Sequence, residues 1–138
     1  MAVVIWNPLF EFNVPLMDKQ HKQIVLIMNT IVERLETGEI DDEVKAQCQK
    51  AIVLVTNHFL EEEKLMENIG YPEIDKQKAM HKEIMAKMLV EKGEIDACED
   101  VLSKGFVEEM REMFKKHILE EDRKYGYYYH RGIMPSAD

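Results

Sequence analysis

One repeated spacing limits the fold of this chain more than any other feature. Between residues 44 and 69, the side chains that would face a core recur at alternating intervals of four and three residues, which is the spacing of one α-helical face. The column consists of Val44, Cys48, Ala51, Val55, His58, Glu62, Leu65 and Ile69. The spacing predicts a long helix, with an N-cap at Asp41 and an end at Gly70, that buries one face against other helices.

Three further segments have the same spacing, between Pro15 and Gly38, between Pro72 and Gly93, and between an N-cap at Asp96 and Gly126. Their columns are Met17, His21, Ile24, Met28, Ile31 and Leu35 in the first, Ile74, Gln77, His81, Ile84 and Met88 in the second, and Leu102, Phe106, Met110, Met113, Phe114, His117 and Ile118 in the third. Short connections make successive helices antiparallel neighbours. We therefore predict an all-α, up-down-up-down four-helix bundle.

The two ends of the chain differ from these segments. Residues 1–14 are apolar and aromatic without a sustained period, and we expect them to form an N-terminal arm packed on the bundle. Residues 126–138 should form a C-terminal tail, rich in tyrosine at its start, with His130 exposed beyond the last helix. At 138 residues, the whole chain is expected to be a single domain.

Composition excludes several classes of function. The formal net charge of −9 disfavours nucleic acid and anionic membrane surfaces as partners, because both need clustered Lys and Arg. No apolar run is long enough to span a bilayer, and the N-terminus lacks a cationic signal-peptide start, so we expect a cytoplasmic location. The two cysteines, Cys48 and Cys98, are too few for a disulfide scaffold.

Polar side chains interrupt the apolar columns in a way that favours a metal site. Burying an unpaired imidazole or carboxylate costs several kcal/mol, roughly 2–7 for a neutral polar group, and a bound metal would remove that penalty. His58 and Glu62 are four residues apart, close enough to contact one metal or two adjacent metals. In the last helix, the spacing does not decide which carboxylate faces the site, since Glu121 shares a face with His117 and Asp122 shares one with Ile118. The inward-facing polar residues are His21, His58, Glu62, His81 and His117.

Two other interpretations account for these residues less well. One is a metal-free bundle with buried histidines, which would need a hydrogen-bond partner for every buried nitrogen. The other is a ferritin-like di-iron bundle, but such bundles use two Glu-x-x-His motifs, and none occurs on the core columns here. Within the run Glu61–Glu63, we expect only Glu62 to point inward.

Several motifs together resemble the hemerythrin family, most closely its bacteriohemerythrin branch. The resemblance extends from Trp6 to about Tyr125. The motifs are Asp-Lys-Gln-His at 18–21, His-Phe-Leu-Glu-Glu-Glu at 58–63, the Tyr71-Pro72 step, and His117 with Asp122 five residues later. Myohemerythrin has the up-down-up-down bundle topology.

The resemblance implies a non-haem di-iron centre, oxo- or hydroxo-bridged, that binds oxygen reversibly at one open iron position. It assigns His21 and His58 to the open iron, and His81 and His117 to the second iron. Glu62 and Asp122 would bridge the two, so the resemblance selects Asp122 over Glu121. Carboxylates and imidazoles in this combination suit iron better than zinc or calcium.

The chain departs from the family pattern on the third helix, where Gln77 stands in place of a histidine ligand. An amide can offer a carbonyl oxygen or hydrogen-bond a water, and either choice weakens the second iron site. Glu73 lies a full turn away and is not expected to substitute. We therefore expect the second iron to be labile or coordinatively open.

Two functions remain open from the sequence. The first is an oxygen-binding protein, a carrier, store or sensor, whose partner is dioxygen. The second is an enzyme, an oxidase, a peroxidase or a protein reactive towards nitric oxide, that uses the position opened at Gln77. No dedicated proton relay or substrate pocket is visible in the sequence, so the oxygen-binding function is preferred.

Overall fold

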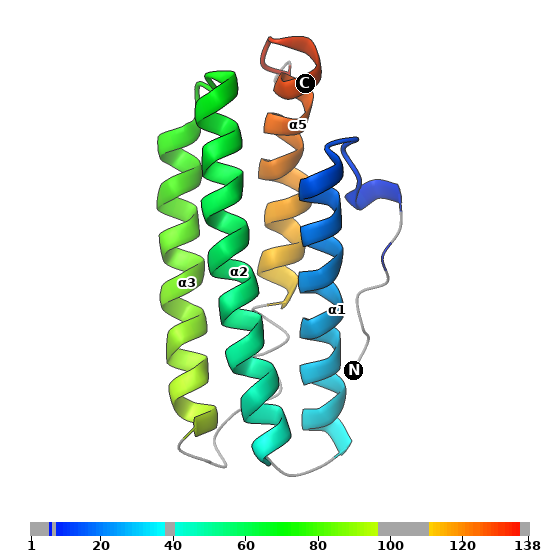
Figure 1. Ribbon diagram of the computed structural model, residues 1–138, viewed down its shortest axis with the longest axis vertical. Helices are drawn as coiled ribbons and strands as arrows, with labels where there is room; N and C mark the ends of the chain where they lie inside the picture. The colour runs from blue at the N-terminus through cyan, green and yellow to red at the C-terminus, as the bar shows by residue number, and fades with distance from the viewer. Residues whose placement is uncertain (1–5, 7, 38–40, 97–110, 136–138) are drawn as a thin grey trace.

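The computed structural model describes residues 6, 8–37, 41–96 and 111–135, and all regular secondary structure in these ranges is helical. Successive helices run antiparallel and lie side by side, as Figure 1 shows. They are α1 (Pro15–Thr37), α2 (Asp42–Ile69), α3 (Ile74–Asp96) and a fourth helical column over residues 111–131. The predicted all-α four-helix bundle is confirmed.

The ends of α2 follow the predicted caps. The Asp41 carboxylate accepts a hydrogen bond from the Val44 backbone N–H at 2.9 Å, so it satisfies one of the donors left open in the first turn. Gly70 ends the helix in the left-handed region with φ 68°, where a residue without Cβ is favoured. α1 ends at Thr37, next to the predicted stop at Gly38, which lies outside the described residues.

Two glycines that were predicted to end helices lie inside them instead. α3 passes Gly93 and ends at Asp96, the residue predicted to cap the fourth helix. The last helix, α5 (Arg123–Arg131), passes Gly126 and ends at Gly132, which has φ 69°. A glycine inside a helix costs only about 1 kcal/mol relative to alanine, and tertiary packing readily outweighs that cost.

At Gly126 the packing that requires glycine is visible. A Cβ on this residue would lie 2.8 Å from the Phe12 Cβ, closer than side-chain carbons approach each other. The glycine therefore permits close packing between the N-terminal arm and α5, rather than a turn. Residues 126–131 belong to the bundle, so the predicted tail begins too early.

The predicted start of the fourth helix lies outside the described residues, and so do Cys98, Leu102, Phe106, Met110 and the side chain of Leu35. From Arg111 onward the column is α-helical, then widens into a π-helical turn, η2 (His117–Asp122), and continues as α5. No helix among the described residues is long and apolar enough to cross a membrane.

The core follows the predicted columns closely, with one shift on α2. Leu65 and Ile69 are only partly buried, whereas Met66 is fully buried. An ideal helix drifts by about 20° per heptad relative to a strict seven-residue pattern, so a long column moves off the core by its last turns. Cys48 is buried among apolar residues, as expected.

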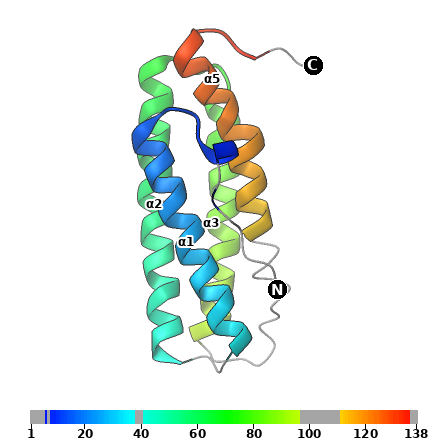
Figure 2. The ribbon, with the colours of Figure 1, turned by 90° about the vertical axis from the view of Figure 1, so that its right-hand side faces the viewer.

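The described part of the N-terminal arm, Trp6 and residues 8–14, packs on the bundle as predicted. Phe10, Phe12 and Val14 are buried, and Figure 2 shows the arm beside α1 and α5. The Asp18 carboxylate accepts hydrogen bonds from the Phe12 and Val14 backbone N–H groups, at 2.9 and 3.2 Å. This carboxylate therefore fixes the arm to the first turn of α1.

A second set of contacts ties the arm to α5. The Arg123 guanidinium donates to the Leu9 carbonyl oxygen, and an imidazole nitrogen of His130 lies 2.9 Å from the Phe12 carbonyl oxygen. His130 is exposed, as predicted, but it lies within α5 rather than beyond the last helix. The described part of the arm is thus packed against α5 as well as against α1.

Candidate metal centre

The structure brings the predicted site residues together in the bundle interior. They come from every helical column: α1 contributes one, α2 and α3 two each, and η2 two. Each has at most 6% of its surface exposed. They are His21, His58, Glu62, Gln77, His81, His117 and Asp122.

Six of these residues form two overlapping groups whose ligand-type atoms lie within 4.8 Å of one another. We call them the first group (His21, His58, Glu62 and Asp122) and the second group (Glu62, His81, His117 and Asp122). Both carboxylates belong to both groups. Each group therefore offers two imidazoles and two shared carboxylates.

The shared carboxylates divide their oxygens between the groups. Glu62 Oε2 lies 3.2 Å from His21 Nε2 and 3.0 Å from His58 Nε2, while Oε1 lies 2.9 Å from His81 Nε2. Asp122 Oδ2 lies 3.1 Å from His21 Nε2, while Oδ1 lies 3.1 Å from His117 Nε2. This is the arrangement that two carboxylates need to bridge two metal ions.

The π-helical turn explains why Asp122, rather than Glu121, faces His117. In an α-helix, five residues turn the chain by about 500°, which would leave the two side chains well apart around the axis. In η2 the hydrogen bonds join residues five apart, such as the Arg123 N–H and the Ile118 carbonyl, so residues five apart share a face. Residue spacing alone could not reveal this turn, and only the resemblance selected Asp122.

The fit of a metal to this cluster follows from its unpaired atoms. His58 Nε2, His117 Nε2 and Asp122 Oδ2 are buried, and although each lies 3.0–3.1 Å from a carboxylate or imidazole of the cluster, none of them makes a hydrogen bond of normal geometry. Leaving a buried polar atom unsatisfied costs about 1–3 kcal/mol each. Metal ions that accept nitrogen and oxygen ligands would satisfy these atoms together, so the donor set fits a metal.

Two of the imidazoles are oriented by partners outside the cluster. His58 Nδ1 donates to the Gln20 amide oxygen at 2.7 Å, and His81 Nδ1 donates to Glu63 Oε2 at 3.0 Å. A proton held on Nδ1 leaves Nε2 with its lone pair directed inward, which is the tautomer a metal requires. Glu63, predicted to lie on the solvated face, is half-buried and takes part in the site.

A buried tyrosine also contacts the cluster. The Tyr125 hydroxyl donates to Glu62 Oε2 at 2.8 Å, and the residue is fully buried. Sequence reasoning missed this role and that of Gln20. Their signal was positional: Tyr125 follows Asp122 by three residues, and Gln20 precedes His21 in the motif at 18–21.

Gln77 lies beside the second group, but its side-chain amide interacts there differently from an imidazole. Its Nε2 donates to Asp122 Oδ1 at 3.2 Å, while its Oε1 is buried without a hydrogen bond. Since the same Asp122 oxygen faces His117, the Gln77 amide holds that carboxylate from one side. Glu73 is only partly buried and belongs to neither group, as expected.

Burial and charge act in opposite directions on the pKa values in the cluster. Burial opposes the charged form of His21, but hydrogen bonds and charge from Asp122 and Glu62 together outweigh it and raise its pKa to about 9. For His58, burial dominates and lowers the pKa. Burial would raise the pKa of Glu62, yet the surrounding imidazoles hold it well below the usual range. The carboxylates are therefore anionic and suited to bind cations.

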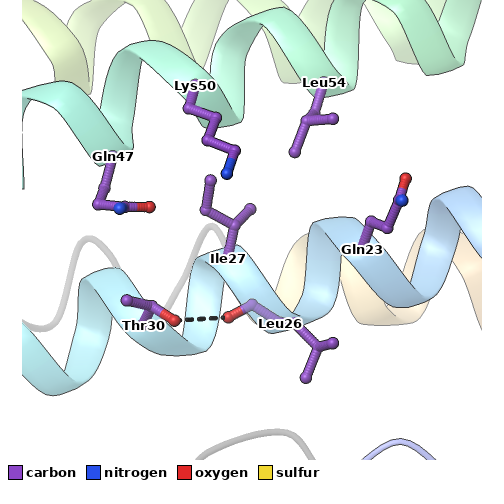
Figure 3. Close-up of a pocket in the computed structure, with 7 residues that line it drawn as sticks. All are labelled: Gln23, Leu26, Ile27, Thr30, Gln47, Lys50 and Leu54. Carbon is purple, nitrogen blue, oxygen red and sulfur yellow. Dashed lines mark hydrogen bonds between the residues drawn. The ribbon is translucent and has the colours of Figure 1, made fainter.

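Surface grooves reach the second group from two sides. A groove between α2 and α3 is lined by Phe59, Glu63 and His81, among others. Another, between α3 and the fourth column, is lined by Met113, His117 and neighbouring residues. A third groove, between α1 and α2, carries no histidine or carboxylate (Figure 3) and reaches neither group.

Comparison with known proteins agrees with this geometry. A sequence model of the family described as Hemerythrin HHE cation binding domain matches residues 13–128. The chain is 27% identical to a bacteriohemerythrin of Stenotrophomonas maltophilia, over 91% of this chain and 81% of that protein. It is 28% identical to a bacteriohemerythrin of Methylococcus capsulatus, over 91% of this chain and 96% of that protein. A bacteriohemerythrin of Campylobacter jejuni is 26% identical, over 88% and 91%.

The fold and the buried cluster define a metal-binding four-helix bundle. The chain belongs to the hemerythrin family, because the family model covers most of its length. Membership of this family, together with the His, Glu and Asp cluster, makes it a metal-binding protein of hemerythrin type.

Proposed function

We propose that this chain is a non-haem di-iron protein that binds dioxygen reversibly. The observation that carries the proposal is the division of the carboxylate oxygens. Glu62 and Asp122 each present one oxygen to the first group and the other to the second group. Two metals side by side use both oxygens of each carboxylate, whereas a single metal would leave one set of imidazoles without a partner.

The chemistry of the donors favours iron at both positions. Imidazole nitrogens suit several transition metals, and carboxylate oxygens add a preference for harder ions. A bound iron pair would supply two metals that each give up one electron reversibly, and an open position for dioxygen. The family model and the similarity to proteins named bacteriohemerythrin, over about nine tenths of this chain, support this metal.

The chain's own residues hold and shield the centre. Gln20 and Glu63 orient the rings of His58 and His81, and Tyr125 donates a hydrogen bond to Glu62. Apart from the two grooves, the cluster lies within a core of buried apolar side chains, Ile118 and Phe114 among them, which limits its contact with water. A dry surrounding favours the return of dioxygen unchanged over oxidation of the metal.

Gln77 makes the two positions more alike than in the family pattern. With an amide in place of an imidazole, each group has two imidazoles and two shared carboxylates. We expect the second position to hold its metal less tightly, because the Gln77 amide hydrogen-bonds Asp122 and is a weaker ligand than imidazole.

An enzymatic function is the second candidate, and one observation favours it. Among the described residues, two surface grooves reach the cluster, and each is lined by an imidazole of the second group, His81 in one and His117 in the other. A small reactant such as peroxide or nitric oxide would meet the position left short of a ligand by Gln77. An oxidase or peroxidase would convert its reactant repeatedly, whereas an oxygen carrier would release dioxygen unchanged.

An oxygen titration separates the two functions. The protein is loaded anaerobically with iron(II), its iron content is measured, and visible absorption is followed as oxygen is added and then removed under argon. We expect two irons per chain and a charge-transfer band that appears and then vanishes. A zinc-loaded sample, which is redox-inert, provides the control. Irreversible conversion to iron(III) contradicts reversible binding and favours the enzymatic function.

A further inference from the structure

The groove between α2 and α3 has charged and apolar side chains at opposite ends. Figure 1 shows the two helices side by side, and they run antiparallel. The volume of the groove is about 420 Å³, which is within the range of sites that bind small molecules. A helix about 10 Å across would fill that volume with a single turn, so the groove suits a small ligand better than a protein partner.

Apolar side chains line the groove from its middle to one end. Leu60 of α2 and Leu89 of α3 lie on opposite walls and are each 56% exposed, and Met85 lies on the α3 wall before Leu89. Thr56 is near Met85, but its hydroxyl already donates to the Ile52 carbonyl oxygen at 2.7 Å. A ligand that covers this end therefore gains from an apolar chain rather than from further hydrogen bonds.

The charged side chains gather at the other end of the groove. Glu63 accepts a hydrogen bond from His81 Nδ1. Lys78 Nζ donates to Glu67 Oε1 at 3.1 Å. Lys82, one turn further along α3, is exposed and has no hydrogen bond or ion pair with any residue that the structure describes. The ammonium group of Lys82 is therefore the charge that remains for an anionic ligand.

We propose that this groove binds an amphipathic monoanion, a carboxylate that contacts Lys82 and extends a short apolar chain past Met85 towards Leu89. Lys82 and Leu89 are about 10 Å apart along the helix axis, which sets the length of the chain. The formal net charge of −9 repels anions from the surface in general, so a carboxylate that binds here is held by this local arrangement. The site goes beyond oxygen binding and does not depend on it.

The groove between α1 and α2 lacks this separation of charged and apolar ends. It also contains a lysine, Lys50, and its volume is about 320 Å³. However, Gln23 lies at one end of it, and Thr30 and Gln47 lie at the other (Figure 3). An apolar chain that began at Lys50 would therefore meet polar side chains in either direction. This second groove provides the comparison for the test.

Isothermal titration calorimetry of the iron-loaded protein with octanoate tests the proposal. We expect one octanoate to bind per chain. Acetate, which lacks the chain, and octyltrimethylammonium, which carries the opposite charge, should bind much more weakly. Lys82→Glu should weaken octanoate binding by roughly 10-fold or more, because an attraction becomes a repulsion. Lys50→Glu, the same charge change in the groove between α1 and α2, should leave the affinity unchanged.

A second pair of variants tests the apolar end. Leu89→Gln should weaken octanoate binding, whereas Leu26→Gln, which changes a leucine of the groove between α1 and α2 that is 52% exposed, should not. All four substituted positions are exposed, so the variants should fold. Helical circular dichroism and iron content are measured on each sample to verify this.

The proposal is overturned if octanoate does not bind to the native protein. Equal binding of acetate also overturns it, because the carboxylate would then be coordinating iron directly. Binding that is lost in Lys50→Glu and kept in Lys82→Glu overturns it as well, because the ligand would then occupy the other groove. Reversible oxygen binding is measured separately, so failure of this proposal leaves the proposed function standing.

Discussion

At the scale of single residues, the tautomers of the imidazoles are decided outside the cluster. His58 and His81 each give one ring proton to an outer acceptor, Gln20 and Glu63, and turn the other nitrogen inward. Outer partners of this kind commonly contribute 10–100-fold to metal affinity. The predictions that follow test which of these contacts hold the metals.

Replacing Gln20 by Leu should weaken metal binding without unfolding the protein. The side chain keeps its size but no longer accepts the His58 Nδ1 proton, so the affinity of the first position should fall by roughly 10-fold or more. Competition with a chelator measures the change. Gln23→Leu, an exposed glutamine of the same helix, is the control. Equal affinities in all three proteins would show that Gln20 does not orient the ring.

Replacing Glu62 by Ala should remove at least one iron per chain, because both positions depend on this carboxylate. Iron analysis after gel filtration gives the stoichiometry. Glu61→Ala removes a neighbouring carboxylate that is 44% exposed and belongs to neither group, so it should leave the iron content unchanged. Two irons retained in Glu62→Ala would refute the bridge.

Replacing Gln77 by His should tighten the second position. An imidazole at this site restores the family pattern, and imidazole is the stronger ligand for iron. We expect slower release of the second iron to a chelator and a longer lifetime of the oxygenated form. An unchanged release rate would mean that residue 77 does not reach the metal.

At the scale of elements, glycine and the π-helical turn show where sequence patterns succeed and where they fail. The columns on α1, α2 and α3 predicted the helices and most buried positions, because a 4-3 spacing reports directly which face is covered. Gly70 ends a helix as predicted, but Gly126 does not, since its role is close contact with Phe12 from the distant N-terminal arm. Such a contact leaves no trace in local sequence.

Local sequence was limited in the same way for the site residues. The inward histidines and Glu62 were visible from their spacing, whereas the carboxylate of η2 required the π-helical turn, which no periodicity predicts. Glu63 was misplaced because its neighbours on α2 suggest solvent, while its partner His81 comes from α3. Residue spacing within one helix therefore could not predict the contacts between different helices.

Gly126→Ala should destabilise the bundle by about 1–3 kcal/mol, the usual cost of overpacking, because the new methyl group would overlap Phe12. Gly93→Ala provides the matched control. It lies within α3 with nothing within 4 Å of the added Cβ, so helix propensity should make it more stable by roughly 0.5–1 kcal/mol. Denaturant unfolding measures both. Equal stabilities would contradict the contact between arm and α5.

At the scale of the whole molecule, metal binding should contribute a large part of the free energy of folding. The metals would join residues from every helical column, and without them several buried polar atoms lack a hydrogen bond. A ligand at 1,000 times its dissociation constant stabilises a protein by about 4 kcal/mol. For a chain of this size, that corresponds to roughly 10 °C in melting temperature.

Removal of iron by a chelator under reducing conditions should therefore lower the melting temperature by about that amount. Circular dichroism at helical wavelengths follows the transition. Restoring iron(II) should restore the transition, which distinguishes loss of metal from damage to the protein. A melting temperature that does not depend on iron would show that the bundle is stabilised by its apolar core alone.

The contact between the N-terminal arm and α5 has a consequence for biosynthesis. Phe12, near the start, is held by Gly126 and His130, and the last shared carboxylate is residue 122 of 138. A nascent chain emerges N-terminus first. Its aromatic arm and its first imidazoles are therefore synthesised well before the residues of η2 and α5 that they contact. Neither the packing of the arm on α5 nor a centre that uses Asp122 can therefore be completed until residues 122–130 have emerged from the ribosome, so a metal that needs the full set of donors would bind only after α5 is synthesised.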